Sequence, residues 1–139
     1  MKNKSEFYLH PQLAADSLLM LELKLCQLRL INDSQFPWFI LVPKRANISE
    51  IYQLSDNDRQ RLWQESDSLS RLLMEHFNGD KLNVAAIGNM VPQLHLHHVV
   101  RFKSDPCWPA PIWGQMPMIG YNENKVSEIR LLLQEKLAN

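Results

Sequence analysis

The sequence contains little cysteine, no excess of either charge and no long hydrophobic run. Its two cysteines, Cys26 and Cys107, lie far apart, and the N-terminal residues MKNKSEFYLH include no apolar stretch of the kind found in secretion signals. We therefore expect a reduced protein of the cytoplasm. No apolar run approaches the roughly 18 residues that a membrane-spanning helix needs, which argues against a membrane protein.

The balance of charge restricts the partners that the sequence supports. The chain has 15 Lys and Arg residues against 15 Asp and Glu residues, with a pI near 7.0. Such a chain gives no electrostatic reason to expect nucleic acid or an anionic membrane as partner, but a small anionic ligand held by local groups is compatible with it. With 139 residues, we expect a single domain over residues 1–139.

Apolar residues recur with a period that changes along the chain. Alternation in SLLMLELKLCQLRLIND shifts parity near its middle, which indicates two strands joined by a tight connection or a bulge. A turn at 32–35 then leads to a buried strand at 38–42, so LINDSQFPWFILVP predicts a hairpin. Ser55 is typical of a helix N-cap, and the spacing that follows predicts a helix of about 22 residues, ended by Asn78-Gly79.

Strand signals return in the second half of the chain, which ends in a helix. Strands are predicted at 82–87 and 93–102, a loop rich in proline and tryptophan at 104–120, and a helix at 126–137. Because the strands group around a helix instead of alternating with helices, we expect an α+β fold. It would contain an antiparallel sheet of about five strands, one long central helix and a C-terminal helix, with its core within residues 17–102.

Three of the five histidines lie within four residues, in PQLHLHHVV. Side chains alternate between the two faces of a strand, so His95 and His97 share one face with Gln93, whereas His98 lies on the opposite, mostly apolar face that should cover the core. Residues at i and i+2 have Cβ atoms about 7 Å apart, so both rings can reach one phosphate or one metal ion. The residues alone therefore predict a phosphate or metal site.

The segment GNMVPQLHLHHVVRF, preceded by FPWFILVPKR, resembles the histidine triad family of nucleotide hydrolases and transferases. The signature of that family places three histidines at alternate strand positions, which here fall on Gln93, His95 and His97. The resemblance extends from about residue 17 to residue 102. It implies a HIT-like fold and a homodimer that binds a small nucleotide substrate and needs no metal or other cofactor.

By this resemblance, His95 is the nucleophile. It would attack the α-phosphorus of a nucleoside phosphoramidate or dinucleoside polyphosphate, giving a nucleotidyl-histidine intermediate that water hydrolyses. This chemistry needs an unprotonated ring nitrogen facing phosphorus, with the proton of the other nitrogen held by a backbone carbonyl. His97 would contact the phosphate or the bridging atom and help to transfer a proton to the leaving group.

Nucleotide-binding residues are also implied. Asp33 aligns with the residue that binds the ribose hydroxyls, Asn32 competes for that role, and Ile31 would lie against the base; Asn-Asp is also ordinary turn composition. Before the histidines, Asn89 would donate to phosphate oxygens while Gly88 lets the backbone approach closely. For Asn89, an ordinary turn position explains the residue almost equally well.

Two residues depart from the family pattern. Gln93 stands at the first triad position, where its amide can form hydrogen bonds but cannot relay a proton. Trp38 stands where the family commonly has a histidine. In the loop at 104–120, Trp108 and Trp113 would cap the pocket, join a dimer interface or only anchor the loop to the core.

Two other functions fit the same residues. A metal-dependent hydrolase would use His95, His97 and His98 as ligands, since catalytic zinc takes three protein ligands. A nucleotide-binding module without turnover would explain the absence of the two family histidines. Loss of activity on chelation would favour the first, and binding without product formation would favour the second.

Overall fold

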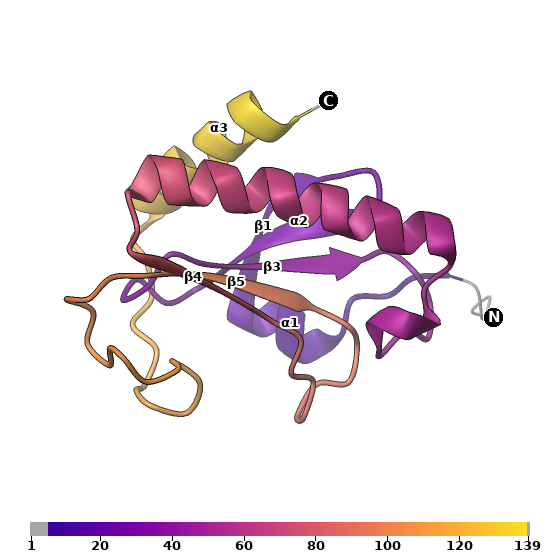
Figure 1. Cartoon of the computed structure of the whole chain (residues 1–139), viewed down its shortest axis with the longest axis horizontal. Helices are drawn as coiled ribbons and strands as arrows, with labels where there is room; N and C mark the ends of the chain where they lie inside the picture. The colour runs from indigo at the N-terminus through magenta and orange to yellow at the C-terminus, as the bar shows by residue number, and fades with distance from the viewer. Residues whose placement is uncertain (1–5, 139) are drawn as a thin grey trace.

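The computed structural model describes residues 6–138 and places five strands in one antiparallel sheet (Figure 1). The sheet has the order β1-β2-β3-β5-β4, formed by β1 (Ser17–Glu22), β2 (Cys26–Ile31), β3 (Trp38–Pro43), β4 (Lys81–Ala85) and β5 (Leu96–Arg101). The helices are α1 (Pro11–Asp16), α2 (Asp56–Phe77) and α3 (Glu123–Leu137), with a short 3-10 helix, η1 (Ile51–Gln53), before α2. The predicted α+β fold is confirmed. Within residues 6–138, none of the helices combines the length and the apolar character needed to cross a bilayer.

Local signals set both ends of α2. The Ser55 Oγ accepts a hydrogen bond from the Asp58 N–H at the first turn, and Asn78 takes the left-handed conformation, with φ 53°, after the last. The helix has 22 residues and ends where the sequence predicts. Gly79 follows because of a close approach: a Cβ at this position would lie 2.3 Å from Cγ1 of Val100 in β5.

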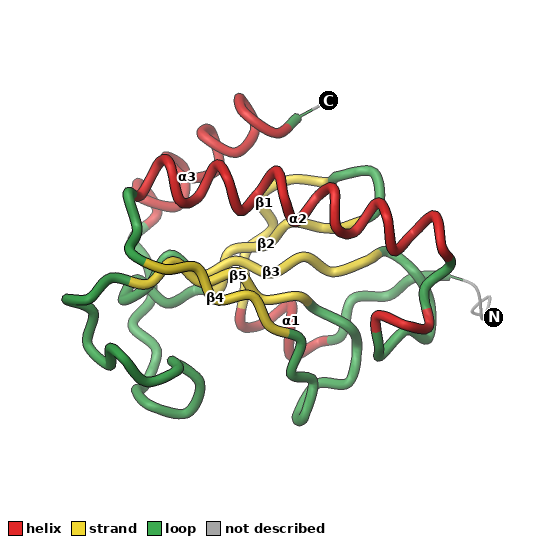
Figure 2. Tube along the Cα trace, in the orientation of Figure 1, coloured by secondary structure: helices red, strands yellow, loops and turns green. Residues whose placement is uncertain are grey.

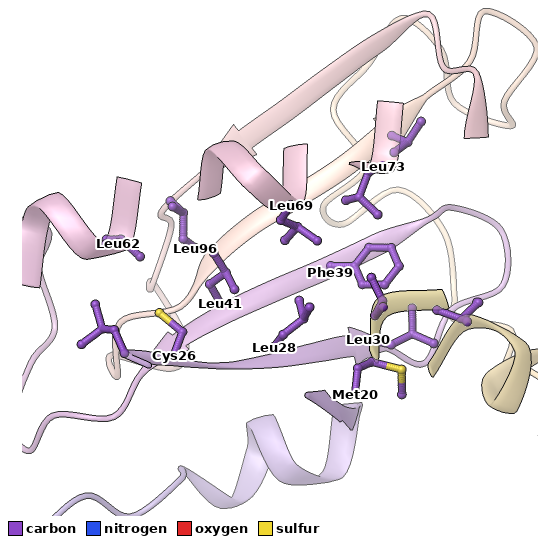
Figure 3. Close-up of a cluster of buried hydrophobic side chains, with 14 of the residues drawn as sticks. Met20, Cys26, Leu28, Leu30, Phe39, Leu41, Leu62, Leu69, Leu73 and Leu96 are labelled. Carbon is purple, nitrogen blue, oxygen red and sulfur yellow. The ribbon is translucent and has the colours of Figure 1, made fainter. Parts of the chain in front are cut away.

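One face of the sheet packs against α2 and α3. Leu62, Leu69 and Leu73 of α2 are fully buried and point toward the strands that carry Leu28, Phe39, Leu41 and Leu96 (Figure 3). Burying each such side chain contributes about 2 kcal/mol to folding. This layer is the main core, and it fixes β3 and β5 from one side.

The opposite face of the sheet is covered by α1 and by the long loop that follows β5 (Figure 2). Leu13 of α1 and Ile112 of the loop join a second apolar cluster with the strand residues Ile31, Trp38, Ile40, Val42 and Val99. All six residues of β3 and all six of β5 are buried. The face that carries the predicted site is therefore a packed layer as well, although for β5 the sequence indicates a core on one face only.

Strand β5 begins later than the sequence predicts, at Leu96 instead of Gln93. Its pairing with both neighbours ends there, since the last pairs are Leu41 with Leu96 and Ala85 with His97. β4 accordingly ends at Ala85, two residues before its predicted end. Gln93 and His95 thus lie in the segment that enters the strand, outside the hydrogen-bonded ladder.

The ends of the chain also contain more helix than the sequence predicts. α3 begins at Glu123, where the Asn122 side chain accepts a hydrogen bond from the Lys125 N–H. α1 has six residues, too few to show an apolar period, and it depends on Pro11 in its first turn and on a cap from the His10 ring. α1 packs onto the sheet through the buried Leu13, whereas residues 123–125 of α3 are exposed and depend on the local Asn122 cap.

Candidate active site

His95 and His97 lie side by side at the start of β5, with ring centroids 4.8 Å apart. His97 pairs with Ile40 of β3 and Ala85 of β4, so its backbone is held on both sides. His95 is 8% exposed and His97 5% exposed. The structure therefore brings the two predicted histidines together in a nearly closed site.

The His95 ring is held in one tautomer by its own backbone. Its Nδ1 lies 2.8 Å from the carbonyl oxygen of Gln93, and because a carbonyl only accepts, Nδ1 must donate its proton there. The lone pair of the neutral ring then resides on Nε2. Burial is the main cause that lowers the pKa of His95, opposed by this backbone hydrogen bond and assisted by nearby His10. The hydrogen bond fixes the proton on Nδ1, and burial keeps the ring neutral, so both favour a nucleophilic Nε2.

The His97 ring is held in the opposite tautomer, by a side chain of β3. The indole Nε1–H of Trp38 donates to Nδ1 of His97 over 2.9 Å, and an indole nitrogen can only donate. The proton of neutral His97 is therefore on Nε2. Burial lowers the pKa of His97 to about 3, with further contributions from His95 and His98. One imidazole thus offers an electron pair and its neighbour offers an N–H group.

Gln93 ties the N-terminal segment to this site. Its Oε1 accepts from the backbone N–H of His10 over 2.8 Å, and its Nε2 donates to the carbonyl of Tyr8 over 2.9 Å. Both halves of the amide are used, so Gln93 acts here as a clasp between distant backbone segments. Its side chain takes no part in the His95–His97 contact.

A pocket of about 390 Å³ opens beside this clasp. Its polar lining includes Tyr8, His10, Asn47, Ser49 and Gln93. A much smaller cavity, also lined by Ser49, reaches Gly88 and His95. Ser49 thus connects the larger pocket with the predicted nucleophile.

His98 does not join the other two histidines. It lies on the α2 face of β5, fully buried, where its Nδ1 donates to the Leu96 carbonyl and its Nε2 lies 2.7 Å from the Ser66 Oγ of α2. The proposed metal site of His95, His97 and His98 is therefore wrong, because the pleat separates the third ring from the first two. Within residues 6–138, no three His, Cys, Asp or Glu side chains gather as a metal site would require.

We expect stability to fall in mild acid because of the two histidines that are neutral in the fold. Burial lowers the pKa of His98 to about 4, against 6.5 unperturbed, and that of His97 to about 3. Below pH 6.5 the unfolded chain binds protons that the folded chain does not, so the free energy of unfolding decreases until the pH reaches the folded-state values. Between pH 7 and 5 each histidine should account for about 2 kcal/mol.

Urea unfolding at the two pH values measures this loss. In His98→Asn the pH-dependent part should shrink by about 2 kcal/mol, whatever the variant's absolute stability. The control is Trp63→Phe, at an exposed position on α2, which removes no titratable group and should leave the pH dependence unchanged. An unchanged pH dependence in His98→Asn would contradict a neutral buried His98.

The three residues expected to bind nucleoside lie together at the end of β2. Ile31 is 3% exposed and shares the second apolar cluster with Trp38. Asp33 is buried, and its Oδ1 accepts from the Gln35 backbone N–H, the Gln35 amide and the Ile119 N–H. The Asn32 Oδ1 accepts from the Tyr121 N–H. Both side chains thus fasten the loop after β5 to the hairpin, a role that their turn composition did not reveal.

Gly88 and Asn89 differ in their distance from the histidines. Gly88 has φ +67°, which favours glycine, and lines the small cavity with His95. Asn89 is exposed in the same loop and lines none of the pockets described above. The structure therefore brings Gly88 to the site and leaves Asn89 at its edge.

The loop after β5 covers the histidines through Trp113. Its ring lies 5.2 Å from the His97 ring and 6.2 Å from the Trp38 ring, between centroids. Trp108 instead lies over the buried guanidinium of Arg101, 5.5 Å away. Of the three roles considered for these residues, Trp113 therefore caps the site and Trp108 anchors the loop.

Two contacts at this site escape sequence analysis. The Trp38–His97 hydrogen bond joins residues 59 positions apart, and the Gln93–Tyr8 hydrogen bond joins residues 85 apart. Each involves a residue that departs from the family pattern. That departure was the only available signal, and it marked the positions without revealing their partners.

Comparisons with known proteins agree with this architecture. The model of the HIT domain family matches residues 12–104, which include all five strands. The structure of a histidine triad protein from Marinobacter aquaeolei VT8 is similar, with 51% identity and a TM-score of 0.92 over 95% of this chain and 96% of that one. A histidine triad protein from Bradyrhizobium japonicum has 36% identity and a TM-score of 0.92, covering 95% and 98%. One from Sinorhizobium meliloti 1021 has 37% identity and a TM-score of 0.91, covering 94% and 97%.

No curated protein matches the chain. The family match nevertheless spans well over half of its length, and the three solved structures cover nearly all of it. Both the fold and the paired histidines agree with the resemblance that the sequence indicates. This chain therefore belongs to the histidine triad family.

Proposed function

We propose that this protein is a nucleotide hydrolase or nucleotidyl transferase that attacks the α-phosphate of a nucleoside phosphoramidate or dinucleoside polyphosphate. The observation that carries the proposal is the hydrogen bond from His95 Nδ1 to the Gln93 carbonyl, because it leaves Nε2 free to attack. Membership of the histidine triad family supports this class of reaction. In the same proposal the protein works as a homodimer in the cytoplasm.

The chemistry begins with the Nε2 lone pair of His95. Its attack forms an N–P bond and breaks the bond from the α-phosphorus to the leaving group, which takes the bonding electrons. The phosphorylated ring carries a positive charge, and the Gln93 carbonyl stabilises that charge through the Nδ1 proton. Water then attacks the same phosphorus, releases the nucleotide and restores the neutral ring.

His97 would stabilise the charge that develops on the phosphate. Because Trp38 donates to Nδ1 of His97, the proton of neutral His97 is on Nε2. His97 thus presents a neutral N–H donor, and its ring centroid lies 4.8 Å from that of His95. A donor already fixed before the substrate binds needs no reorganisation in the transition state. Gly88 would add close backbone approach, and Asn89 would contact the phosphates from the rim.

Binding of the nucleoside is assigned to the end of β2. Ile31 would pack against the base, and Asp33 would accept a ribose hydroxyl through Oδ2, since the contacts described above use Oδ1. Asn32 is the alternative ribose ligand. Gln93 would act indirectly, because its clasp on Tyr8 and His10 shapes the pocket beside the nucleophile.

The direct test measures AMP release from an adenosine phosphoramidate and from a diadenosine polyphosphate in the presence of EDTA. Turnover on at least one of them is expected, together with a nucleotidyl adduct on the peptide that contains His95, detected by mass spectrometry after rapid quenching. Activity that disappears with EDTA and returns with a divalent metal would contradict the mechanism. Binding of both nucleotides without any product would identify a binding module instead.

A further inference from the structure

The contact between Trp38 and His97 limits what His97 can do. Trp38 is 7% exposed, and its indole is packed edge-on against Trp113. Its Nε1–H is directed at Nδ1 of His97 over 2.9 Å. If His97 became an imidazolium, Nδ1 would carry a proton as well, and two donors would face each other at this distance. The contact therefore stabilises only the neutral ring.

The surroundings of His97 do not compensate for such a conflict. Its partners across the sheet, Ile40 and Ala85, carry no charge. The titratable groups that act on it are His95 on the same face and His98 on the other, and both oppose a positive charge. A neutral Nε2–H group can donate a hydrogen bond, but giving up its proton would leave an imidazolate.

Leaving groups differ in whether they need a proton. When a P–N bond breaks, the departing amine nitrogen must gain a proton, and a general acid at this position contributes about 10²–10⁴-fold to such a step. When a phosphoanhydride breaks, the bridging oxygen takes the electron pair and leaves as part of a phosphate anion. No proton is required for that departure.

We propose that Trp38 is a positioning residue that holds His97 as a neutral donor, and that the site therefore prefers nucleotides with a phosphate leaving group, such as dinucleoside polyphosphates, over phosphoramidates. The inference rests on the proposed function and narrows its substrate class. In this step the His95 Nε2–P bond forms, the P–O bond to the bridging oxygen breaks, and the anion departs while His97 donates to a non-bridging oxygen. Water then cleaves the N–P bond, and one proton is released to solvent.

The experiment compares kcat and KM for a diadenosine polyphosphate with those for an adenosine phosphoramidate of a simple alkylamine. In the natural protein, kcat/KM for the anhydride should exceed that for the amide by about 100-fold or more. Trp38→Phe removes the donor that directly opposes a second proton on His97 Nδ1, so the ratio should fall by about 10-fold through a higher kcat for the amide. Trp38→His, which can relay a proton, should lower the ratio further.

A spectroscopic measurement tests the positioning role without turnover. ¹⁵N shifts of the His97 ring should report an unprotonated Nδ1 and a protonated Nε2 in the natural protein, and a mixture of forms in Trp38→Phe. The matched control is Trp63→Phe, at an exposed position on α2, which should change neither the shifts nor the ratio.

Two outcomes would overturn the inference. The first is a natural protein that cleaves the amide as fast as the anhydride, and the second is a His97 tautomer that is the same with and without Trp38. Absence of turnover on both nucleotides would refute the proposed function and the substrate preference with it. The ¹⁵N spectra would still decide whether Trp38 fixes the ring.

Discussion

Replacing His95 with alanine is expected to lower kcat by about 10⁴-fold or more, because it removes the group proposed to form the covalent bond to phosphorus. KM should change much less, since the residues expected to hold the nucleotide lie around the end of β2 and in the loop before β5. Steady-state release of AMP measures both parameters. The covalent adduct should disappear from the variant.

Two further variants make this result specific. In His95→Gly, the missing ring leaves space for free imidazole. Added imidazole should restore part of the activity, because it can serve as the nucleophile without being attached to the chain. His76→Ala removes an exposed histidine of α2, whose ring contacts Phe77, and should retain normal turnover. A His95→Ala protein that keeps more than about a tenth of the activity would refute nucleophilic catalysis by this residue.

Replacing Asp105 with alanine is expected to cost about 3–5 kcal/mol of folding free energy. The Arg101 guanidinium binds both carboxylate oxygens of Asp105, at 2.7 and 3.1 Å, and the side chains of this pair are only 2% and 3% exposed. Burial acts to raise the pKa of Asp105, but Arg101 and the N–H groups of Phe102 and Cys107 outweigh it, so the pKa is lowered overall. Without Asp105, a buried guanidinium would lose its counter-ion.

Urea denaturation measures this cost, and an exposed ion pair provides the control. Lys125 and Glu128 are 47% and 70% exposed, so Glu128→Ala should cost less than about 0.5 kcal/mol. Combining Asp105→Ala with Arg101→Met should be less damaging than Asp105→Ala alone, because the uncompensated charge is then absent. If Asp105→Ala lowers the free energy of unfolding by less than about 1 kcal/mol, water must solvate the Arg101 guanidinium in place of the carboxylate, and the expected cost is refuted.

The parts of the fold that the sequence predicts are those set by local signals. The cap at Ser55 and the stop at Asn78 lie within one turn of the helix that they delimit. The continuous apolar run at 38–42 identifies β3 without knowledge of its partners. A backbone carbonyl that fixes the His95 tautomer was expected from the chemistry, and the structure shows that its acceptor is the Gln93 carbonyl, two residues away.

What the sequence could not predict depends on segments that meet only in the folded chain. The second apolar layer requires α1 and the loop after β5 to arrive on the same face of the sheet. Asp33 and Asn32 have a turn composition, but their partners, Ile119 and Tyr121, follow more than 80 residues later. Trp38 departs from the family pattern, and the sequence does not reveal that its indole N–H donates to Nδ1 of His97.

Because of the clasp formed by Gln93, we expect the orientation of His95 to depend on a segment more than 80 residues earlier in the chain. A protease that cut the chain before Pro11 would remove Tyr8 and His10, and both ends of the Gln93 amide would lose their backbone partners. The carbonyl of the same Gln93 orients the His95 ring. Removal of the first ten residues is therefore expected to change how the ring of His95, the proposed nucleophile, is held, although every residue of the β-sheet stays intact.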